Sequence, residues 1–571
     1  MTPEVRLDGR PNGSADWRAD WRVPLLLALI AMLLYLPGIT WGTPQADGLG
    51  RSATLAPDEL GPTGPLVLVR NALQNDSGAS PQYPLFHYIF LCIFYAPYLL
   101  FEILRGGLRN PQRLYPYGFA NPVRAIHILF LIARGVSILM GAGIVVVAYF
   151  TASELWDRFT AVLAATFVML LFPMFYYSRI SNVDVPAVFW TSIVLFLFVR
   201  ILQDGLSLRR ALFLGLFSAL AVATKDQYYA AIVVLPLIFL PLHIQRMREA
   251  GAALWQSCAA PLAGLFVAGA TYGLASGLFI RPARYFHHIN FIRFGAGTGW
   301  YYKYPATLAG YAGLARESLG YLASTLSWPL LLAATAGALL CLRRNRLNLS
   351  LLVVVPAIFL LVLVPVRLVL LRFLILPAYV LALYAAFAIA AALRSSRTPL
   401  RWTAGLAAAA ACAFMLLHGA DLTYSMMRDP RDQASAWLNA HTRDGDQVEI
   451  FAPVSRAGEY PQLNPGRRYI SSRLGDTPNG AWLQGDFVIV LVNRANLRIP
   501  FYPDWVDHEL RSGARDYLPV ATFQNRSYFD FQELPVNQRL DIFARRNRAL
   551  ELVAAGEGPV SGVPASSGPT Q

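Results

Sequence analysis

The stretch that decides the fold is Ala125–Phe150, AIHILFLIARGVSILMGAGIVVVAYF, in which Arg134 is the one Asp, Glu, Lys or Arg. A membrane-spanning helix needs about 20 mostly apolar residues, so this segment is long enough to cross a bilayer. Further predicted spans lie at 23–40, 159–177, 185–201, 211–224, 228–243, 257–280, 319–342, 348–364, 369–393 and 402–418. The pattern predicts a polytopic α-helical membrane protein with about 11–13 transmembrane helices.

The composition supports this class. Of the 571 residues, 56% are hydrophobic and only 14% are charged, with a mean hydropathy of +0.43. These values exclude a soluble globular enzyme, a disordered protein and a fibrous one. The net charge of +14 comes from the first 418 residues, which hold 32 Lys and Arg against 16 Asp and Glu. The last 153 residues hold 16 against 18, which argues against a nucleic-acid-binding arm.

Charge asymmetry also predicts the orientation in a plasma (inner) membrane. Residues 1–22 are expected to be a cytoplasmic segment, and the short Arg-rich loops are expected to lie on the same side. This orientation requires that the apolar stretch 84–104 does not cross the membrane as a single additional span. We therefore favour an interfacial or re-entrant helix there, with a membrane-spanning helix as the alternative. The large loops 41–122 and 281–318 then lie outside.

The end of the chain reads as a separate unit. We expect a transmembrane catalytic domain over 23–418 and a small extracytoplasmic α/β domain over 419–553. In the second, 432–441 has helical character and three segments read as strands: 447–452, 487–492 and 517–523. Gly, Pro, Ser and Ala dominate from 554 to 571, which is typical of a disordered tail.

Three carboxylates on the expected outer face are candidates for chemistry. Asp58 and Glu59 follow the first span, where they could act as a general base or bind a divalent metal, although such a pair is also common in a solvated turn. Asp184 lies at the mouth of the next predicted helix, as a functional group or simply as a helix cap.

Cations near the same face are candidates for binding a phosphate. Lys225 is one of only two lysines, and either a phosphate oxygen or the neighbouring Asp226 could be its partner. The loop that follows residue 280 mixes cations with aromatic side chains, which suit either an interfacial anchor or a lipid-linked phosphate. The candidates there and in the tenth span are His287, His288, Arg293, Tyr302, Lys303, Arg367 and Arg372. His287 and His288 lack the spacing of metal ligands, and the four cysteines form no CxxC pair.

These motifs occur in an order that resembles the GT-C-fold glycosyltransferases of family 39, which include protein O-mannosyltransferases and lipid A aminoarabinose transferases. The resemblance covers residues 20–395. The segments that carry it are Pro57-Asp58-Glu59, Gln82-Tyr83-Pro84-Leu85, Ala133-Arg134-Gly135-Val136-Ser137, Tyr177-Ser178-Arg179, Asp184-Val185-Pro186, Thr224-Lys225, the loop from His287 to Tyr302 and Arg372-Phe373-Leu374-Ile375-Leu376-Pro377.

The resemblance implies an integral membrane glycosyltransferase that moves a sugar from a polyprenyl-phosphate carrier to a lipid, glycan or protein hydroxyl on the outer face, with inversion. It implies that Asp58 is the base or orients the acceptor, that Asp184 is the second acidic position, and that Glu59 lies beside them. The implied donor-phosphate residues are Arg134, Lys225, Arg293 and Arg372. A substrate loop would hold His287, His288, Tyr302 and Lys303. The implied partners are the lipid-linked donor, membrane lipids and the acceptor, without nucleic acid.

The chain departs from one branch of that family. Aminoarabinose transferases usually show Asp-Glu-x-Arg-Tyr and Glu-Lys-Pro, where this chain has Asp58-Glu59-Leu60-Gly61-Pro62 and Gln82-Tyr83-Pro84. The sugar, the acceptor and a requirement for a divalent metal therefore stay open, and no cofactor is firmly expected. The alternatives are a lipid or solute transporter or flippase, which inverted repeats would favour, and a non-catalytic assembly subunit.

Overall fold

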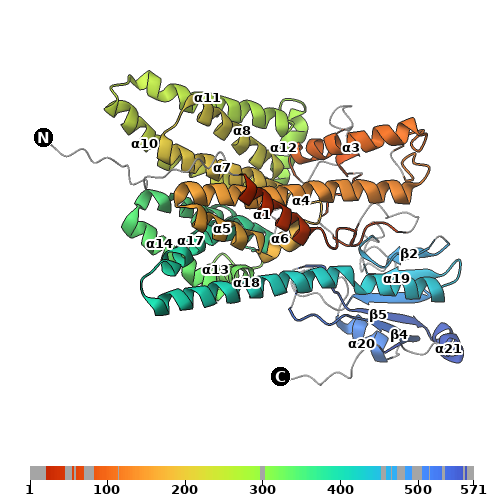
Figure 1. Cartoon of the computed structure of the whole chain (residues 1–571). Helices are drawn as coiled ribbons and strands as arrows, with labels where there is room; N and C mark the ends of the chain where they lie inside the picture. The colour runs from red at the N-terminus through yellow and green to blue at the C-terminus, as the bar shows by residue number, and fades with distance from the viewer. Residues whose placement is uncertain are drawn as a thin grey trace.

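Two parts of the chain differ in architecture: a bundle of long apolar helices and, at one end of it, a small α/β domain (Figure 1). This computed structural model confirms the predicted polytopic helical fold with a C-terminal α/β domain. It describes residues 21–45, 54–56, 59–62, 64–67, 69, 83–112, 115–295, 302–451, 458–464, 466–471, 483–491, 504–512, 515–529, 531, 534–556 and 560–561.

The helices follow one another with short connections. In the first half they are α1 (Arg22–Tyr35), α3 (Phe86–Leu104), α4 (Pro122–Leu155), α5 (Arg158–Met169), α6 (Phe172–Tyr177), α7 (Asp184–Asp204), α8 (Leu208–Thr224), η1 (Asp226–Tyr228), α9 (Tyr229–Val233), α10 (Pro236–Glu249), α11 (Leu254–Ala275), α12 (Pro282–Asn290) and η2 (Phe291–Gly295). The second half has α13 (Leu308–Leu326), α14 (Trp328–Arg344), η3 (Arg346–Val353), α15 (Val354–Ile358), η4 (Phe359–Leu363), α16 (Val364–Val366), η5 (Leu371–Leu374), α17 (Ile375–Leu393) and α18 (Thr398–Met427).

Local sequence explains where these helices begin and end. The Asn121 side chain caps α4 by accepting from the Arg124 N–H at 3.0 Å, and Pro122 occupies the first turn. The Asp157 carboxylate caps α5 through the N–H groups of Phe159 and Thr160. Helix α7 ends at Gly205, whose φ of 83° is a conformation that glycine adopts without strain.

The spans differ in detail from those expected. Among the described residues, eight helices are long and apolar enough to cross a membrane, or nine if α13 and α14 count as one broken span with a bend of 104°. The expected spans 23–40 and 159–177 are occupied by the shorter apolar helices α1 and α5. Pro173 and Pro329 mark the start of α6 and α14, because proline favours the first turn of a helix and interrupts its interior.

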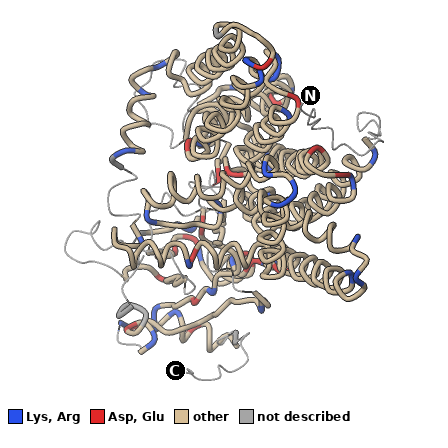
Figure 2. The backbone as a smooth tube through the Cα atoms, turned by 90° about the vertical axis from the view of Figure 1, so that its left-hand side faces the viewer, with Lys and Arg blue, Asp and Glu red and all other residues tan. Residues whose placement is uncertain are grey.

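The connections at one end of the bundle carry many arginines. The connections that follow α4, α7, α10, α14 and α17 all lie at the end of the bundle opposite the C-terminal domain, at the left of Figure 1. Figure 2 looks onto this end and marks its cations in blue. The arginines in or beside these connections are Arg158, Arg209, Arg210, Arg248, Arg343, Arg344, Arg346, Arg394 and Arg397.

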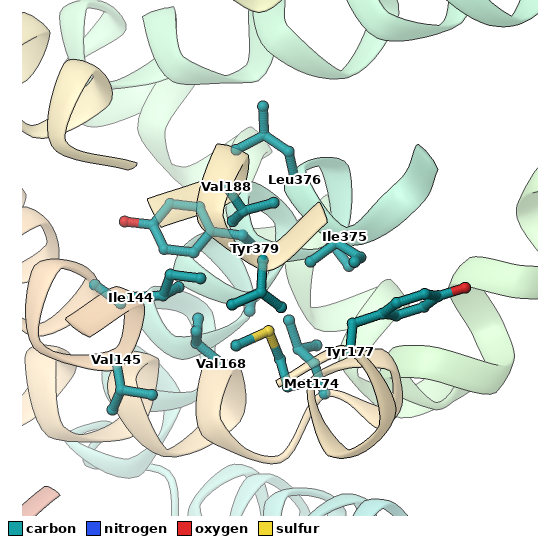
Figure 3. Packing of buried hydrophobic residues seen from close by; sticks show 14 of the residues in the cluster. Ile144, Val145, Val168, Met174, Tyr177, Val188, Ile375, Leu376 and Tyr379 are labelled. Atoms are coloured by element: carbon teal, nitrogen blue, oxygen red, sulfur yellow. The ribbon is translucent and has the colours of Figure 1, made fainter. Parts of the chain in front are cut away.

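The core of the bundle is apolar and continuous. Tyr379 and Ile375 of α17 pack among Ile144 of α4, Val168 of α5 and Val188 of α7 (Figure 3). Helix α17 is buried over most of its length, so its flanking helices are held around it by the burial of apolar surface and by packing.

Helix α3 occupies the stretch whose placement was left open. It is long and apolar enough to span. In Figure 1 it lies beside the half of α4 that points toward the C-terminal domain. Its first turn packs on the outer end of α7, where the Phe86 and Phe90 rings lie 5.9 and 6.1 Å from the Trp190 ring.

The C-terminal domain is a mixed sheet with three helices. The sheet order is β2-β1-β3-β5-β4-β6, with parallel pairs β1–β2, β1–β3 and β4–β6 and antiparallel pairs β3–β5 and β4–β5. Its strands are β1 (Gln447–Ile450), β2 (Arg468–Ser471), β3 (Phe487–Leu491), β4 (Tyr517–Phe523), β5 (Leu540–Arg545) and β6 (Val560–Ser561). Its helices are α19 (Pro430–His441), α20 (Asp504–Ser512) and α21 (Arg546–Ala554).

The expected helix and three strands all appear, as α19, β1, β3 and β4. Two boundaries differ from the expectation. Helix α18 runs through 418–419, the expected border of the domain, and continues to Met427. Strand β6 lies within the segment expected to be disordered, whose part from 562 onward is outside the described residues.

Candidate functional site

The loop that follows α1 carries the first candidate acids. Asp58 lies outside the described residues, but Glu59 is described and its side chain is 1% exposed. Its carboxylate accepts from the Arg134 Nε at 2.7 Å, the Arg134 Nη2 at 2.6 Å and the Ser181 N–H at 2.7 Å, and also from the Thr54 hydroxyl. Glu59 therefore ties this loop to α4 and to the segment before α7.

Arg134 is fully buried in the bundle. Besides its two bonds to Glu59, its Nη1 donates to the carbonyl of Trp41 at 2.8 Å and to that of Ile39. These contacts satisfy most of its donors without any phosphate. In this geometry Arg134 holds the loop in place, and we do not carry its expected contact with the donor phosphate into the proposal below.

Asp184 and Lys225 form a second buried pair. The Lys225 Nζ donates to the Asp184 Oδ1, and the Asn182 amide donates to the other carboxylate oxygen at 2.9 Å. Asp184 is 1% exposed and Lys225 5% exposed. Both are candidates from the sequence: a phosphate oxygen or Asp226 was expected as the partner of Lys225, and Asp184 was expected to be a functional group or a helix cap. The structure joins them instead across 41 residues.

Aromatic rings surround this pair. The Lys225 Nζ lies 5.9 Å from the centre of the Tyr83 ring and 5.4 Å from that of Phe373. The Arg372 guanidinium lies 5.8 Å from the same Phe373 ring. Such contacts between a cation and a ring are attractive, so Arg372 and Lys225 share one wall of the site.

A small pocket, with a volume of about 10 Å³, lies next to Tyr83. It is bounded by the residues that precede α3, the end of α11 and one face of α12. Its lining residues are Tyr83, Pro84, Leu85, Ser276, Gly277, Arg281, Arg284, Tyr285 and His288. Tyr83 thus belongs both to this pocket and to the surroundings of Lys225. Arg281 and Arg284 are not among the site residues predicted from the sequence.

The other candidates of the loop that follows residue 280 lie in different parts of the structure. His288 is buried in the pocket and contacts the Asp226 carboxylate at 3.1 Å, whereas His287 and Arg293 are exposed. Lys303 pairs with Glu317, which also accepts from the Tyr304 hydroxyl at 2.7 Å.

Tyr302, the remaining candidate of the loop, stacks on Arg367, a candidate of the tenth predicted span. The Tyr302 ring lies 3.5 Å from the Arg367 guanidinium. Arg367 accepts from the backbone N–H groups of Lys303 and Tyr304 at 3.1 and 3.2 Å through its own carbonyl. The structure therefore brings His288 to the pocket and gathers Tyr302 and Lys303 in a different cluster.

A divalent metal does not fit the described residues as a resident ion. No group of three or more His, Cys, Asp or Glu side chains among them has the geometry of a metal site. Both Glu59 oxygens are already taken by Arg134, Ser181 and Thr54. We derive no chemical step through a metal.

Comparison with known families agrees with the resemblance drawn from the motifs. The model of the dolichyl-phosphate-mannose-protein mannosyltransferase family matches residues 124–271, from the start of α4 into α11. This segment contains Arg134, Asp184 and Lys225, so the predicted resemblance is confirmed for this part of the chain. No curated protein sequence matches the chain.

Among solved structures the chain is similar to ArnT from Cupriavidus metallidurans bound to undecaprenyl phosphate, with a TM-score of 0.46 and 11% identity, over 91% of this chain and 97% of that one. It is also similar to the oligosaccharyltransferase AglB from Archaeoglobus fulgidus in complex with an inhibitory peptide and a dolichol-phosphate, with a TM-score of 0.43 and 13% identity, over 83% and 70%. For the complex of the A. fulgidus oligosaccharyltransferase with zinc and sulfate, the TM-score is 0.42 and the identity 13%, over 78% of this chain and 62% of that chain's length.

Proposed function

We propose that this chain is a membrane glycosyltransferase that transfers a hexose or pentose from a polyprenyl-phosphate carrier to a hydroxyl group of a lipid, glycan or protein. The observation that carries the proposal is the pocket with two arginines, joined through Tyr83 to the buried Lys225–Asp184 pair. The family match over 124–271 supports the same class and gives the transporter alternative no support.

The reaction takes place on the extracytoplasmic face. The Arg-rich connections gather at one end of the bundle, and cytoplasmic loops carry the excess of Lys and Arg in membrane proteins. The C-terminal domain lies at the opposite end (Figure 1). Asp184 begins α7 and Lys225 follows α8, so both lie at the helix ends away from the Arg-rich connection between these two helices. The lipid carrier then reaches the pocket from the bilayer with its phosphate at the level of Arg281 and Arg284.

The transfer needs one base and several cations. Asp58 accepts the proton of the acceptor hydroxyl while the hydroxyl oxygen forms a bond to the anomeric carbon. The bond from that carbon to the phosphate oxygen breaks, and its electron pair leaves with the polyprenyl phosphate. Arg281, Arg284 and Lys225 stabilise the charge that develops on the phosphate. Asp184 and Asn182 keep the Lys225 ammonium in position.

The Arg284→Gln variant is expected to bind undecaprenyl phosphate about tenfold more weakly than the native protein, because a hydrogen bond from a charged donor to phosphate contributes about 1.5–3 kcal/mol. The affinity is measured by native mass spectrometry of the detergent-solubilised protein over a range of lipid concentrations. Arg248→Gln is the matched control, since Arg248 is exposed at the far end of α10. Equal affinities of Arg284→Gln and the control would contradict the placement of the phosphate.

Lys225→Met is expected to lower the turnover number by about 100-fold, since it removes a cation from the leaving phosphate and leaves Asp184 without its partner. Lys225→Arg keeps the charge and should recover part of the rate. Sugar transfer is followed as the release of polyprenyl phosphate, with unfolding midpoints recorded for each variant. Full activity of a folded Lys225→Met protein would remove this lysine from the site.

A further inference from the structure

The loop after α1 is held from two sides by buried ion pairs. On the bundle side, Arg134 binds Glu59 and the carbonyls of Ile39 and Trp41. On the domain side the corresponding residue is Arg431, which lies at the start of α19 and is 1% exposed. The two arginines come from different domains and contact the same loop.

Arg431 joins four segments of the chain. Its Nε and Nη2 bind the two carboxylate oxygens of Asp429, each at 2.8 Å. Its Nη1 donates to the carbonyls of Leu55 at 3.4 Å and Glu459 at 3.3 Å, and its Nη2 also donates to the carbonyl of Pro535. Leu55 belongs to the loop after α1, whereas Glu459 and Pro535 belong to the C-terminal domain.

Trp41 connects the two ion pairs. Its carbonyl accepts from Arg134 at 2.8 Å, and its indole Nε1 donates to the Asp429 Oδ2 at 2.9 Å. The Arg431 guanidinium lies 5.6 Å from the centre of its ring. Trp41 is 3% exposed, so the whole connection is shielded from water, where such contacts are stronger than at a surface.

A second contact ties the loop to the C-terminal domain. The Gln462 Nε2 donates to the carbonyl of Thr43 at 3.0 Å, and the backbone N–H of Gln45 donates to the Gln462 Oε1 at 2.7 Å. Because the Gln462 side chain donates to one residue of this short segment and accepts from another, it fixes the position of the segment relative to the domain.

The domain is itself anchored on the bundle. The Asp421 carboxylate at the end of α18 accepts from the N–H groups of Tyr528 and Phe529 at 2.9 and 3.0 Å. The His418 ring stacks between Phe172 of α6 at 3.7 Å and Phe529 at 4.4 Å. Arg431 and Gln462 therefore contact the loop from a domain that is itself fixed to the bundle.

We propose that the C-terminal domain positions the loop that carries Asp58, and that Arg431 and Gln462 are its positioning residues. The inference rests on the proposed function. Leu55 and Glu59, which flank Asp58 in the sequence, are held by Arg431 and Arg134 respectively. Because a small displacement of a catalytic group costs a large part of the rate, loosening this support lowers turnover without touching the donor pocket.

The test separates turnover from donor binding in the full-length protein. Gln462→Ala and Arg431→Lys are compared with Arg443→Gln, which alters a surface pair with Glu551 in the same domain. For the first two variants kcat is expected to fall about tenfold or more, whereas the affinity for undecaprenyl phosphate and the KM for the donor stay within about twofold. Arg443→Gln should match the native protein in all three quantities.

Each possible result leads to a different conclusion. If native kcat persists in folded Gln462→Ala and Arg431→Lys, the positioning role is overturned while the proposed function stands. A parallel loss of donor affinity in both variants also overturns it, because the domain would then shape the donor pocket. If Arg431→Lys does not fold, Gln462→Ala decides alone. If the native protein transfers no sugar from any polyprenyl-phosphate donor, the proposed function and this inference fail together.

Discussion

Asp58→Asn is expected to reduce sugar transfer by at least about 100-fold, because general base catalysis contributes about 10²–10⁴-fold and asparagine cannot accept the proton of the acceptor hydroxyl. The substitution preserves size and shape, so folding and donor binding should be unchanged. Mass spectrometry of free polyprenyl phosphate measures transfer, and native mass spectrometry measures donor affinity.

The control for this variant is Glu551→Gln, which neutralises an exposed carboxylate on α21, far from the pocket along the chain. It should transfer sugar at the native rate. Turnover in Asp58→Asn that equals this control would rule out Asp58 as the base. Loss of transfer together with loss of donor binding would indicate that Asp58 is part of the donor site and not a proton acceptor.

Arg134→Ala is expected to lower the free energy of unfolding by about 3–5 kcal/mol, since it leaves the Glu59 carboxylate buried without its cation. The carbonyls of Ile39 and Trp41 lose their donor as well. Equilibrium unfolding of the purified protein in mixed detergent micelles measures the effect. The expected effect is large because both side chains are at most 1% exposed.

A double variant identifies the cause of that loss. Replacing both members, in Arg134→Met with Glu59→Leu, removes the uncompensated charge and should recover part of the stability lost in Arg134→Ala. Arg248→Ala, at an exposed position of α10, should leave stability within about 0.5 kcal/mol of the native value. An unfolding free energy of Arg134→Ala equal to that of Arg248→Ala would contradict the structural role of the pair.

Much of the bundle could be predicted from hydropathy. The segments 125–150, 185–201 and 369–393 correspond to α4, α7 and α17, because long apolar runs must satisfy their backbone groups as helices in lipid. The breaks were not predicted. A hydropathy window averages over Pro329, whereas the structure begins α14 there, directly after Ser327 with its φ of 71°. For the same reason, a single span was predicted over 159–177, where the structure has the two helices α5 and α6.

Several residues of the candidate site could be chosen from the sequence, but their pairings could not be predicted. Asp184 and Lys225 were both chosen, yet their ion pair joins positions 41 residues apart. Arg134 likewise binds Glu59, which lies 75 residues before it. No spacing rule connects residues on different helices, so these contacts follow only from the packing of α4, α7 and α8. Arg281 and Arg284 could be chosen only from the structure, where they line the pocket between α12 and the start of α3.

The resemblance to the mannosyltransferase family identified the reaction class but left the substrates undetermined. The family match covers α4 to α11 and excludes the C-terminal domain and the segment before Arg124. The match ends before α12, so it includes neither Arg281 nor Arg284 and does not identify the acceptor. In the proposed mechanism, α11 and α12 bind the lipid phosphate. The C-terminal domain supports the loop that carries Asp58, the proposed base.

The most direct test of the account is the donor specificity of the native protein. Purified protein in lipid nanodiscs is incubated with polyprenyl-monophosphate hexoses and pentoses, with the corresponding pyrophosphate-linked sugars, and with an extract of cell-envelope lipids and glycans as acceptor. Mass spectrometry then follows the free carrier. We predict that at least one monophosphate-linked sugar releases polyprenyl phosphate, and that Arg284→Gln slows this release. Release only from pyrophosphate-linked sugars, or from no donor by a folded protein, would contradict the central claim.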